Sequence, residues 1–255
     1  MKTFKTSIVA LLLLAAISCK KDSTSASLTS DQAADVAASA LASNSGGVTS
    51  MADDISANAS TVASVGGPSI NSVGVATIHQ ACGTTLTDST TRSGSDSSVT
   101  FNYFTKYTHT LNCNAQEQPD NLVNTLIYTG SFSGPRISTT ANGTANATIA
   151  GLTQTAINYV INGEYKRTGT FQSKVGNKAS GNSNLDVVIT NLTLSKPGRA
   201  IVSGSGTFTL TGTAGKVDYS YSGTITFNGN GTVTLSVTGG SSYNIRLASG
   251  VCTRR

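Results

Sequence analysis

The chain has 255 residues, of which 11% are charged and 6% are aromatic, and it contains no tryptophan. Its formal charge is +5, but the lysines and arginines are scattered along the chain, whereas proteins that bind nucleic acids usually gather them on one face. This argues against a nucleic-acid partner. The abundance of Gly, Ser, Thr and Asn is typical of an all-β protein with many short turns that works outside the cytoplasm.

The N-terminal 18 residues have the pattern of an export signal. Lys2 and Lys5 come first, and an apolar run over residues 8–17 follows them. About ten residues of helix reach roughly 15 Å, which is half of what the core of a bilayer requires. The run is therefore too short for a permanent span and predicts a cleaved signal peptide over residues 1–18. The alternative is an ordinary secretory signal that ends in a chance cysteine.

The residues around Cys19 indicate which kind of signal this is. Residues 16–19, Ala-Ile-Ser-Cys, resemble the lipobox of bacterial lipoproteins, although that motif usually begins with Leu. Residues 18–22, Ser-Cys-Lys-Lys-Asp, are similar to the start of many Bacteroidota lipoproteins. The resemblance implies an outer-membrane lipoprotein that is lipidated on Cys19 and held to the membrane by its acyl chains. The periplasmic and the surface side both stay open, because Asp22 alone represents the acidic signal for surface display.

A tether and a short helical segment are expected next. Residues 19–29 are rich in Lys, Ser, Thr and Ala and predict a flexible tether. Residues 30–67 predict one or two short helices or further linker, because two weak capping boxes precede apolar positions and glycine pairs follow them. The expected N-cap and end are Thr29 and Gly46 for the first helix, and Ser50 and Gly66 for the second.

From residue 68 to residue 255 the period of apolar residues is two, which predicts an antiparallel β domain. Between Val99 and Cys113 the odd positions are mostly apolar and the even ones mostly polar, the pattern of a strand with one face in the core. The expected fold is an all-β antiparallel meander that forms a curved sheet, a sandwich or a soluble barrel. A membrane barrel also alternates, but Thr, Asn and Gly interrupt this apolar face too often. Similar strand patterns cover residues 122–132, 158–172, 185–194 and 200–210.

The C-terminal strands allow a prediction of register. One hairpin centred on Asn230 and a second centred on Gly240 bring the apolar residues of three strands into line. Slipping either hairpin by one residue would send a whole apolar set into water. The expected cross-strand rows are Phe227–Val233–Leu247 and Ile225–Leu235–Ile245.

Three cysteines remain besides the lipidated one, and a pair of them is expected to be oxidised outside the cytoplasm. If residues 96–99 form the loop of a hairpin, Cys82 lies opposite Cys113 and the apolar faces of both strands stay on one side. This register predicts a Cys82–Cys113 disulfide that stabilises the fold by roughly 3–4 kcal/mol on the chain-entropy model. Cys252 is out of phase with its apolar neighbours and is expected to be unpaired.

The sequence suggests no catalytic, cofactor or metal site. Three cysteines without close spacing do not match a zinc site, and nucleophile elbows and phosphate-binding loops are absent from the sequence. His109 would join Tyr107 and Cys113 in a catalytic or metal pocket on the more specific interpretation. The simpler one, which we prefer, is a half-buried strand histidine that keeps a hydrogen bond.

Three functions remain as hypotheses. The first is a lipid-anchored envelope protein that binds a glycan or a protein without catalysis, and outward tyrosines in a groove would favour it. The second is an adhesin or fibre subunit, which needs an uncovered sheet edge. The third is a glycan hydrolase, which needs two carboxylates in one cleft. The chain resembles β-rich Bacteroidota lipoproteins of unknown function at its lipobox, at Cys82 and over residues 162–169, which implies no activity. The tyrosines that could stack on a glycan are expected to face the core and not a groove, because they alternate in phase with the apolar residues. They are Tyr103, Tyr107, Tyr219 and Tyr221.

Overall fold

The computed structural model describes residues 27–63 and 80–255. The predicted signal peptide, the lipidation site Cys19 and the predicted helix end at Gly66 lie outside these ranges. Two helices precede a series of strands. The helices are α1 Ser30–Leu41 and α2 Val48–Ala63, and the strands are β1 Thr85–Ser95, β2 Thr100–Cys113, β3 Pro119–Ser133, β4 Ile137–Ala150, β5 Asn158–Ser173, β6 Ser180–Ser195, β7 Ile201–Ala214, β8 Val217–Gly229, β9 Thr232–Val237, β10 Ser242–Arg246 and β11 Val251–Arg254.

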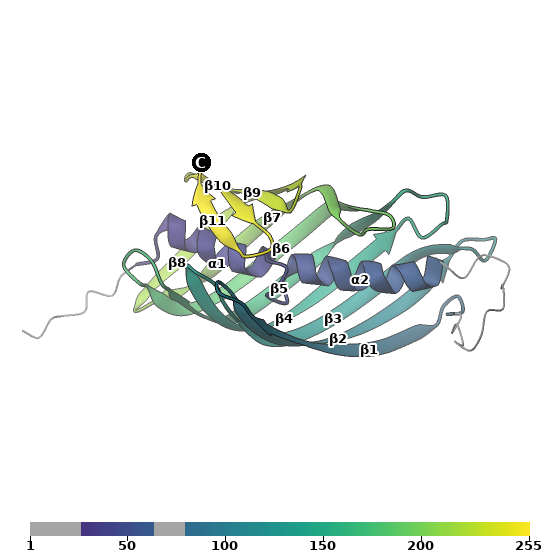
Figure 1. Cartoon of the computed structure of the whole chain (residues 1–255), viewed down its shortest axis with the longest axis horizontal. Coiled ribbons are helices and arrows are strands. Elements are labelled where there is room, and N and C mark those ends of the chain that lie inside the picture. The colour runs from purple at the N-terminus through teal and green to yellow at the C-terminus, as the bar shows by residue number, and fades with distance from the viewer. Residues whose placement is uncertain (1–26, 64–79) are drawn as a thin grey trace, which may run out of the picture.

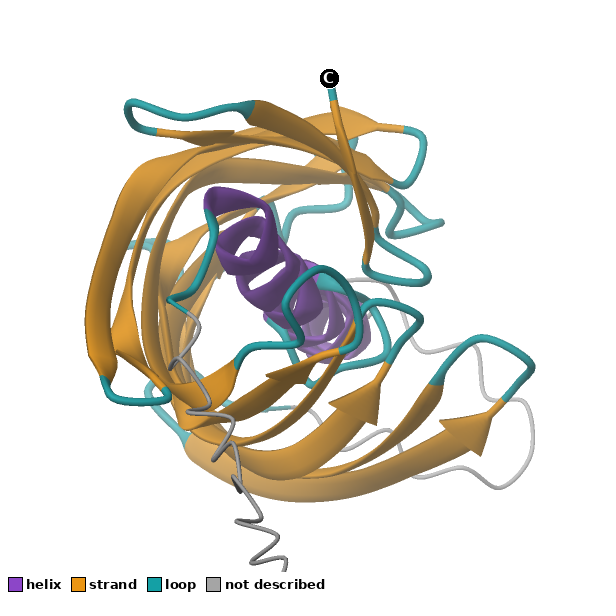
Figure 2. Ribbon diagram, turned by 90° about the vertical axis from the view of Figure 1, so that its left-hand side faces the viewer, coloured by secondary structure: helices purple, strands orange, loops and turns teal. Residues whose placement is uncertain are grey.

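All the strands belong to one antiparallel sheet, in which each strand pairs with its neighbour in the sequence. The sheet curves strongly, and its two end strands, β1 and β11, do not pair with each other (Figures 1 and 2). The predicted antiparallel meander is therefore confirmed. Of the three expected shapes, the structure adopts the open curved sheet.

Both helices lie inside the curve of the sheet, as the end-on view shows (Figure 2). The first helix contacts β4, β5, β9 and β11, and the second contacts β3, β4 and β5. In α1, every residue from Gln32 to Leu41 is buried. Its many alanines explain how a helix fits there, because small side chains allow the sheet to approach from several directions. Helices and sheet thus share one hydrophobic core.

The predicted N-cap is correct for α1 and wrong for α2. Thr29 caps α1 and forms a reciprocal capping box with Gln32, as predicted. The predicted cap of α2 was wrong, because that helix begins at Val48. The hydroxyl of Ser50 donates to the carbonyl of Ser43 in the connection between the helices, so it is not available as a cap.

The predicted tether is shorter than expected at its C-terminal end. Leu28 is buried, and its carbonyl accepts a hydrogen bond of 2.6 Å from the hydroxyl of Tyr221 on β8. The carbonyl of Ser27 likewise accepts a bond of 3.0 Å from the side chain of Asn177. Residues 27–29 therefore belong to the folded domain.

The first hairpin has the predicted register. The loop closes where the Asp96 amide donates to the carbonyl of Val99 at 2.9 Å. The Cys82–Cys113 disulfide is present, with its sulfur atoms 2.06 Å apart. Because Cys82 precedes the first residue of β1, the bridge fastens the start of the sheet to the end of β2.

The predicted register of the C-terminal meander is correct in one hairpin and wrong in the next. The hairpin centred on Asn230 is confirmed, but the next hairpin is centred on Gly239 and not on Gly240. Val237 donates its amide to the carbonyl of Ser241 at 3.1 Å, which closes a loop whose middle glycine has φ +68°. The error is two residues, so each apolar residue keeps its face. The actual rows are Phe227–Val233–Ile245 and Ile225–Leu235–Tyr243.

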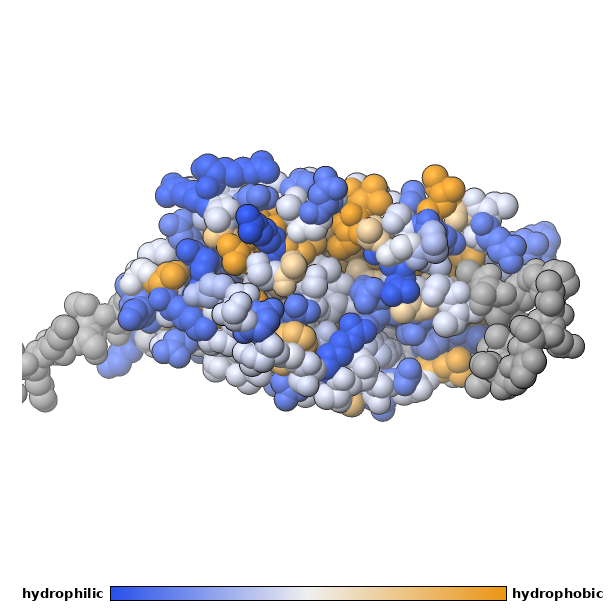
Figure 3. Space-filling model, in the orientation of Figure 1, coloured by the Kyte–Doolittle hydropathy of each residue, from blue (hydrophilic) through white to orange (hydrophobic). Residues whose placement is uncertain are grey.

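The concave face of the sheet is mostly apolar, and the convex face is mostly Thr, Ser and Asn. Tyr103 and Tyr107 are buried on the concave face, and Tyr219 and Tyr221 are partly buried against the core. The core interpretation of these four tyrosines is therefore confirmed. On the open side of the molecule, apolar residues appear as separate spots among hydrophilic ones (Figure 3).

Candidate functional site: a cleft at the open side of the sheet

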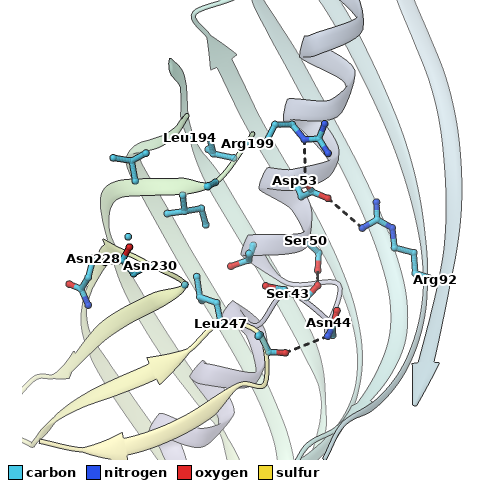
Figure 4. A pocket seen from close by; sticks show the side chains of 17 residues that line it. Ser43, Asn44, Ser50, Asp53, Arg92, Leu194, Arg199, Asn228, Asn230 and Leu247 are labelled. Carbon is cyan, nitrogen blue, oxygen red and sulfur yellow. Dashed lines mark hydrogen bonds and ion pairs between the residues drawn. The ribbon is translucent and has the colours of Figure 1, made fainter. Parts of the chain in front are cut away.

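A cleft of about 770 Å³ lies where the curved sheet fails to close. One wall is the start of α2 together with the connection from α1, and Arg92 of β1 completes that side. The facing wall is built from the turns β6–β7, β8–β9 and β10–β11 (Figure 4). This volume falls within the range of small-molecule sites, which are commonly formed where separate elements meet.

The charged side of the cleft is centred on Asp53 of α2. Its carboxylate lies 3.3 Å from Nε of Arg199 in the β6–β7 turn and 3.8 Å from a terminal nitrogen of Arg92 (Figure 4). All three side chains are between one third and one half exposed. One helix residue therefore connects both sides of the opening through two partly exposed ion pairs.

Asp54 lies behind this group and faces the core. Its carboxylate accepts a hydrogen bond of 2.8 Å from the hydroxyl of Tyr107 and pairs with Arg92. Burial raises the pKa of Asp54, and the bonds from Tyr107 and Arg92 oppose that effect. Arg92 thus forms ion pairs with two aspartates, one in the cleft and one beneath it.

The opposite side of the cleft is apolar. Leu194 and Leu247 form buried parts of the wall, and Ile201 is half-buried. Val202 is 47% exposed, a large fraction for a branched aliphatic side chain. Asn230, in the β8–β9 turn, adds a polar group beyond this wall. The cleft is therefore amphipathic, with ion pairs on one side and aliphatic side chains on the other.

The backbone holds Arg199 in an uncommon conformation. Its φ is +53°, in the left-handed region that residues other than Gly and Asn rarely adopt. Its amide donates to the carbonyl of Ser195 at 2.8 Å, and this bond closes the turn. The turn thereby directs the guanidinium toward α2, where it meets Asp53.

The described lining of the cleft is poor in acids. Of its described lining residues, Asp53 is the only carboxylate, since Asp54 faces away toward Tyr107. Another close pair of acids, Glu164 and Asp186, flanks Lys166 on the convex face at 2.9 and 3.9 Å, outside any cleft of this size. The described residues of the cleft thus do not present the two facing carboxylates that glycoside hydrolysis requires.

The residues considered from the sequence as a catalytic group do not line the cleft. Cys113 is in the disulfide, and Tyr107 binds Asp54. His109 is buried instead of half-buried, and its Nδ1 has no hydrogen-bond partner among the described residues. Burial lowers the pKa of His109, so the ring is expected to be neutral at neutral pH.

Cys252 is the free cysteine of the described chain, and it is buried. It lies close to Asp35 of α1 and to Arg136, whose Nε is 2.7 Å from that carboxylate. Burial raises the pKa of the Cys252 thiol to about 12. Since the thiolate is the reactive form, this cysteine is expected to be inert.

The sequence did not single out the three charged residues of the cleft. A weak signal was present, because Arg92 is the only basic residue in a strand composed mostly of Ser and Thr, and Arg199 follows a Pro-Gly turn. Neither feature shows that the two side chains meet, because they are more than one hundred positions apart.

Comparison with known proteins does not assign the chain to a group. No family model matches it, and neither a curated protein nor a solved structure is significantly similar to it. Among the residues that the structure describes, no helix is both long enough and apolar enough to cross a bilayer. Functional inference therefore depends on the leader sequence and on the geometry of the cleft.

Proposed function

We propose that the protein is a lipid-anchored outer-membrane protein of the cell envelope that binds a small ligand in the cleft without catalysis. The observation that carries this proposal is an amphipathic cleft of about 770 Å³ at the opening of a sheet that is otherwise filled by its own helices. The leader and Cys19 support the anchor, because their pattern resembles a lipobox.

The cleft is suited to binding because its walls are fixed without a ligand. Arg199 and Arg92 hold Asp53 from two sides, and the side-chain amide of Asn44 donates to the carbonyl of Ala248 at 3.4 Å. A site that is already ordered loses little conformational entropy when it binds. A glycan held by aromatic stacking is less consistent with it, because none of the described residues that line the cleft is aromatic.

Filling the cleft tests the proposal. Val202→Trp should abolish the fluorescence enhancement of the uncharged apolar dye N-phenyl-1-naphthylamine, because the indole would occupy the apolar wall. Val188→Trp is the matched control, since this valine is also 47% exposed but lies on the convex face. Equal enhancement by both variants, or no enhancement with the wild type, would overturn the binding role.

The anchor is tested separately. Cys19→Ser should move the protein from the membrane fraction to the soluble fraction and remove labelling by radioactive palmitate. Cys252→Ala should keep both, although it also removes one cysteine. Protease shaving of intact cells then assigns the side of the membrane: digestion with an intact periplasmic control indicates the surface, and protection until lysis indicates the periplasm.

A second candidate function is assembly by strand addition, as in an adhesin or fibre. β1 is an edge strand over Thr85–Ser95 and is largely exposed. Such an edge can pair with another strand, and lysines on edges prevent this. If the edge assembles, Thr91→Lys should abolish concentration-dependent association in sedimentation velocity, whereas Thr129→Lys in the interior strand β3 should not. A wild type that stays monomeric at all concentrations would exclude self-assembly.

A further inference from the structure

Arg199 lines the cleft with both of its terminal nitrogens available to a ligand. Its Nε faces Asp53 at 3.3 Å, but no acceptor among the described residues lies within hydrogen-bond distance of its two terminal nitrogens. The side chain is 35% exposed and lines the cleft. A guanidinium has five N–H donors in a fixed fork that matches carboxylate and phosphate groups.

Arg92 does not have the same freedom. One terminal nitrogen donates to the buried Asp54, and the other forms an ion pair with Asp53 at 3.8 Å, so its charge neutralises acids of the protein itself. The two arginines therefore differ in role. Arg92 balances the aspartates of α2, and Arg199 is the donor that can also serve a ligand.

The start of α2 adds to the positive potential beside Arg199. Thr49 and Ser50, in the first turn, line the cleft, and this turn has no acidic residue. Their hydroxyls donate to the carbonyls of Leu41 and Ser43, so these side chains do not cap the helix. The partial positive charge at the N-terminus of a helix favours an anion nearby, and here it reinforces the guanidinium.

The rest of the cleft fits an apolar body. Leu194, Ile201 and Val202 line the cleft next to the turn that carries Arg199. The exposed area of Val202 would be removed from water by a ligand that lies along this wall, which is the usual source of affinity for apolar groups. A cationic ligand has less to gain, because Asp53 is already shared by two arginines.

We propose that the ligand is an amphiphile with a single anionic group, whose apolar part lies along Leu194, Ile201 and Val202 and whose anionic group binds Arg199. The inference rests on the proposed function and specifies the ligand class of the same cleft. A carboxylate and a phosphate monoester share the required chemistry.

Competition between matched compounds tests the inference. Decanoate, decyl phosphate and decan-1-ol have the same chain and differ in the head group, and each is titrated against the bound naphthylamine dye at pH 7.5. We expect decanoate or decyl phosphate to displace the dye from the wild type at concentrations about tenfold lower than decanol, as one charge-assisted hydrogen-bonding contact would give. The preferred anion of the two identifies the head group.

Arg199→Gln should remove this preference, so that the anions weaken about tenfold and decanol keeps its wild-type affinity. Unchanged decanol binding also shows that the variant is folded. Arg199→Lys should restore part of the preference, and Arg246→Gln, which removes an exposed arginine of β10 outside the cleft, should leave it unchanged.

The outcomes separate the two proposals. If decanol competes as well as the anions, or if Arg199→Gln keeps the preference, the anionic ligand class is wrong while the cleft remains a binding site. If Val202→Trp binds the dye as strongly as the wild type, the proposed function itself fails.

Discussion

The two edges of the sheet end in different ways. The first edge, β1, is a long strand rich in Ser and Thr, and its side chains are mostly exposed. The last edge consists of the short strands β9, β10 and β11, and it folds inward over α1, where Tyr243, Ile245 and Cys252 are buried. One sheet therefore has a polar edge fixed by cross-links and an apolar edge fixed by packing.

The cross-links at the first edge replace the core that it lacks. Cys82 and Cys113 join its start to β2, and Arg92 joins its far half to Asp53 and Asp54 of α2. At the last edge, Tyr243 and Asp31 of α1 share a hydrogen bond of 2.6 Å, but apolar burial dominates. The difference explains why the cleft opens between the edges: only one of them has the apolar residues needed to close over the helices.

The largest loss of stability is expected from a substitution in the packed edge. Ile245→Ala should lower the free energy of unfolding by about 2–5 kcal/mol, because the side chain is fully buried and leaves a cavity. Leu86→Ala on β1 should cost less than about 1 kcal/mol, since that side chain is 40% exposed. Urea unfolding followed by circular dichroism measures both. Equal losses would show that the two edges are packed alike.

A smaller loss is expected when the covalent link of the polar edge is removed. The double substitution Cys82→Ala and Cys113→Ala should cost about 2–4 kcal/mol, because the bridge constrains a loop with a sequence separation of 31 residues in the unfolded chain. The same urea titration measures it. Reducing the wild-type disulfide with dithiothreitol should give a similar loss, and it should leave the double variant unchanged. A double variant as stable as the wild type would show that β1 does not need the bridge.

Much of the fold could be predicted, because apolar and polar residues alternate clearly in strands whose core-facing residues are large. This alternation is clear in β2 and in the C-terminal strands, and the prediction of which face of each strand is buried was correct there. β4 was missed, because its inner positions include Ala141, Ala145 and Ala147, which give a weak apolar signal. Small residues are needed there: a side chain at Gly143 would collide with the ring of Tyr128.

The site was less predictable than the fold, because it depends on where the sheet stops. Asp53, Arg92 and Arg199 come from a helix, an edge strand and a turn, and only the curvature of the whole sheet brings them together. The disulfide was predictable, since it depends on the register of a single hairpin. Contacts within one hairpin follow from local pattern, whereas the cleft is a property of the assembled sheet.

The smallest predicted effect concerns the buried acid beneath each edge. Asp54 lies under β1 with Arg92, and Asp35 lies near β11 with Arg136. Burial raises the pKa of both carboxyls above the unfolded value of 3.8. The native state therefore holds these protons more tightly than the unfolded state, and the associated stability is present below pH 3.8 and is lost as the pH rises through each native pKa. Asp54→Asn and Asp35→Asn should each flatten the decline of unfolding free energy above about pH 4, because neither amide titrates. The two changes should add, since the sites share no partner.

Urea titrations from acid to neutral pH measure the slopes, with the exposed Asp218→Asn as control. A slope that changes only in Asp54→Asn would show that the polar edge alone carries a buried charge, and unchanged slopes in both would show that the two ion pairs fully offset burial.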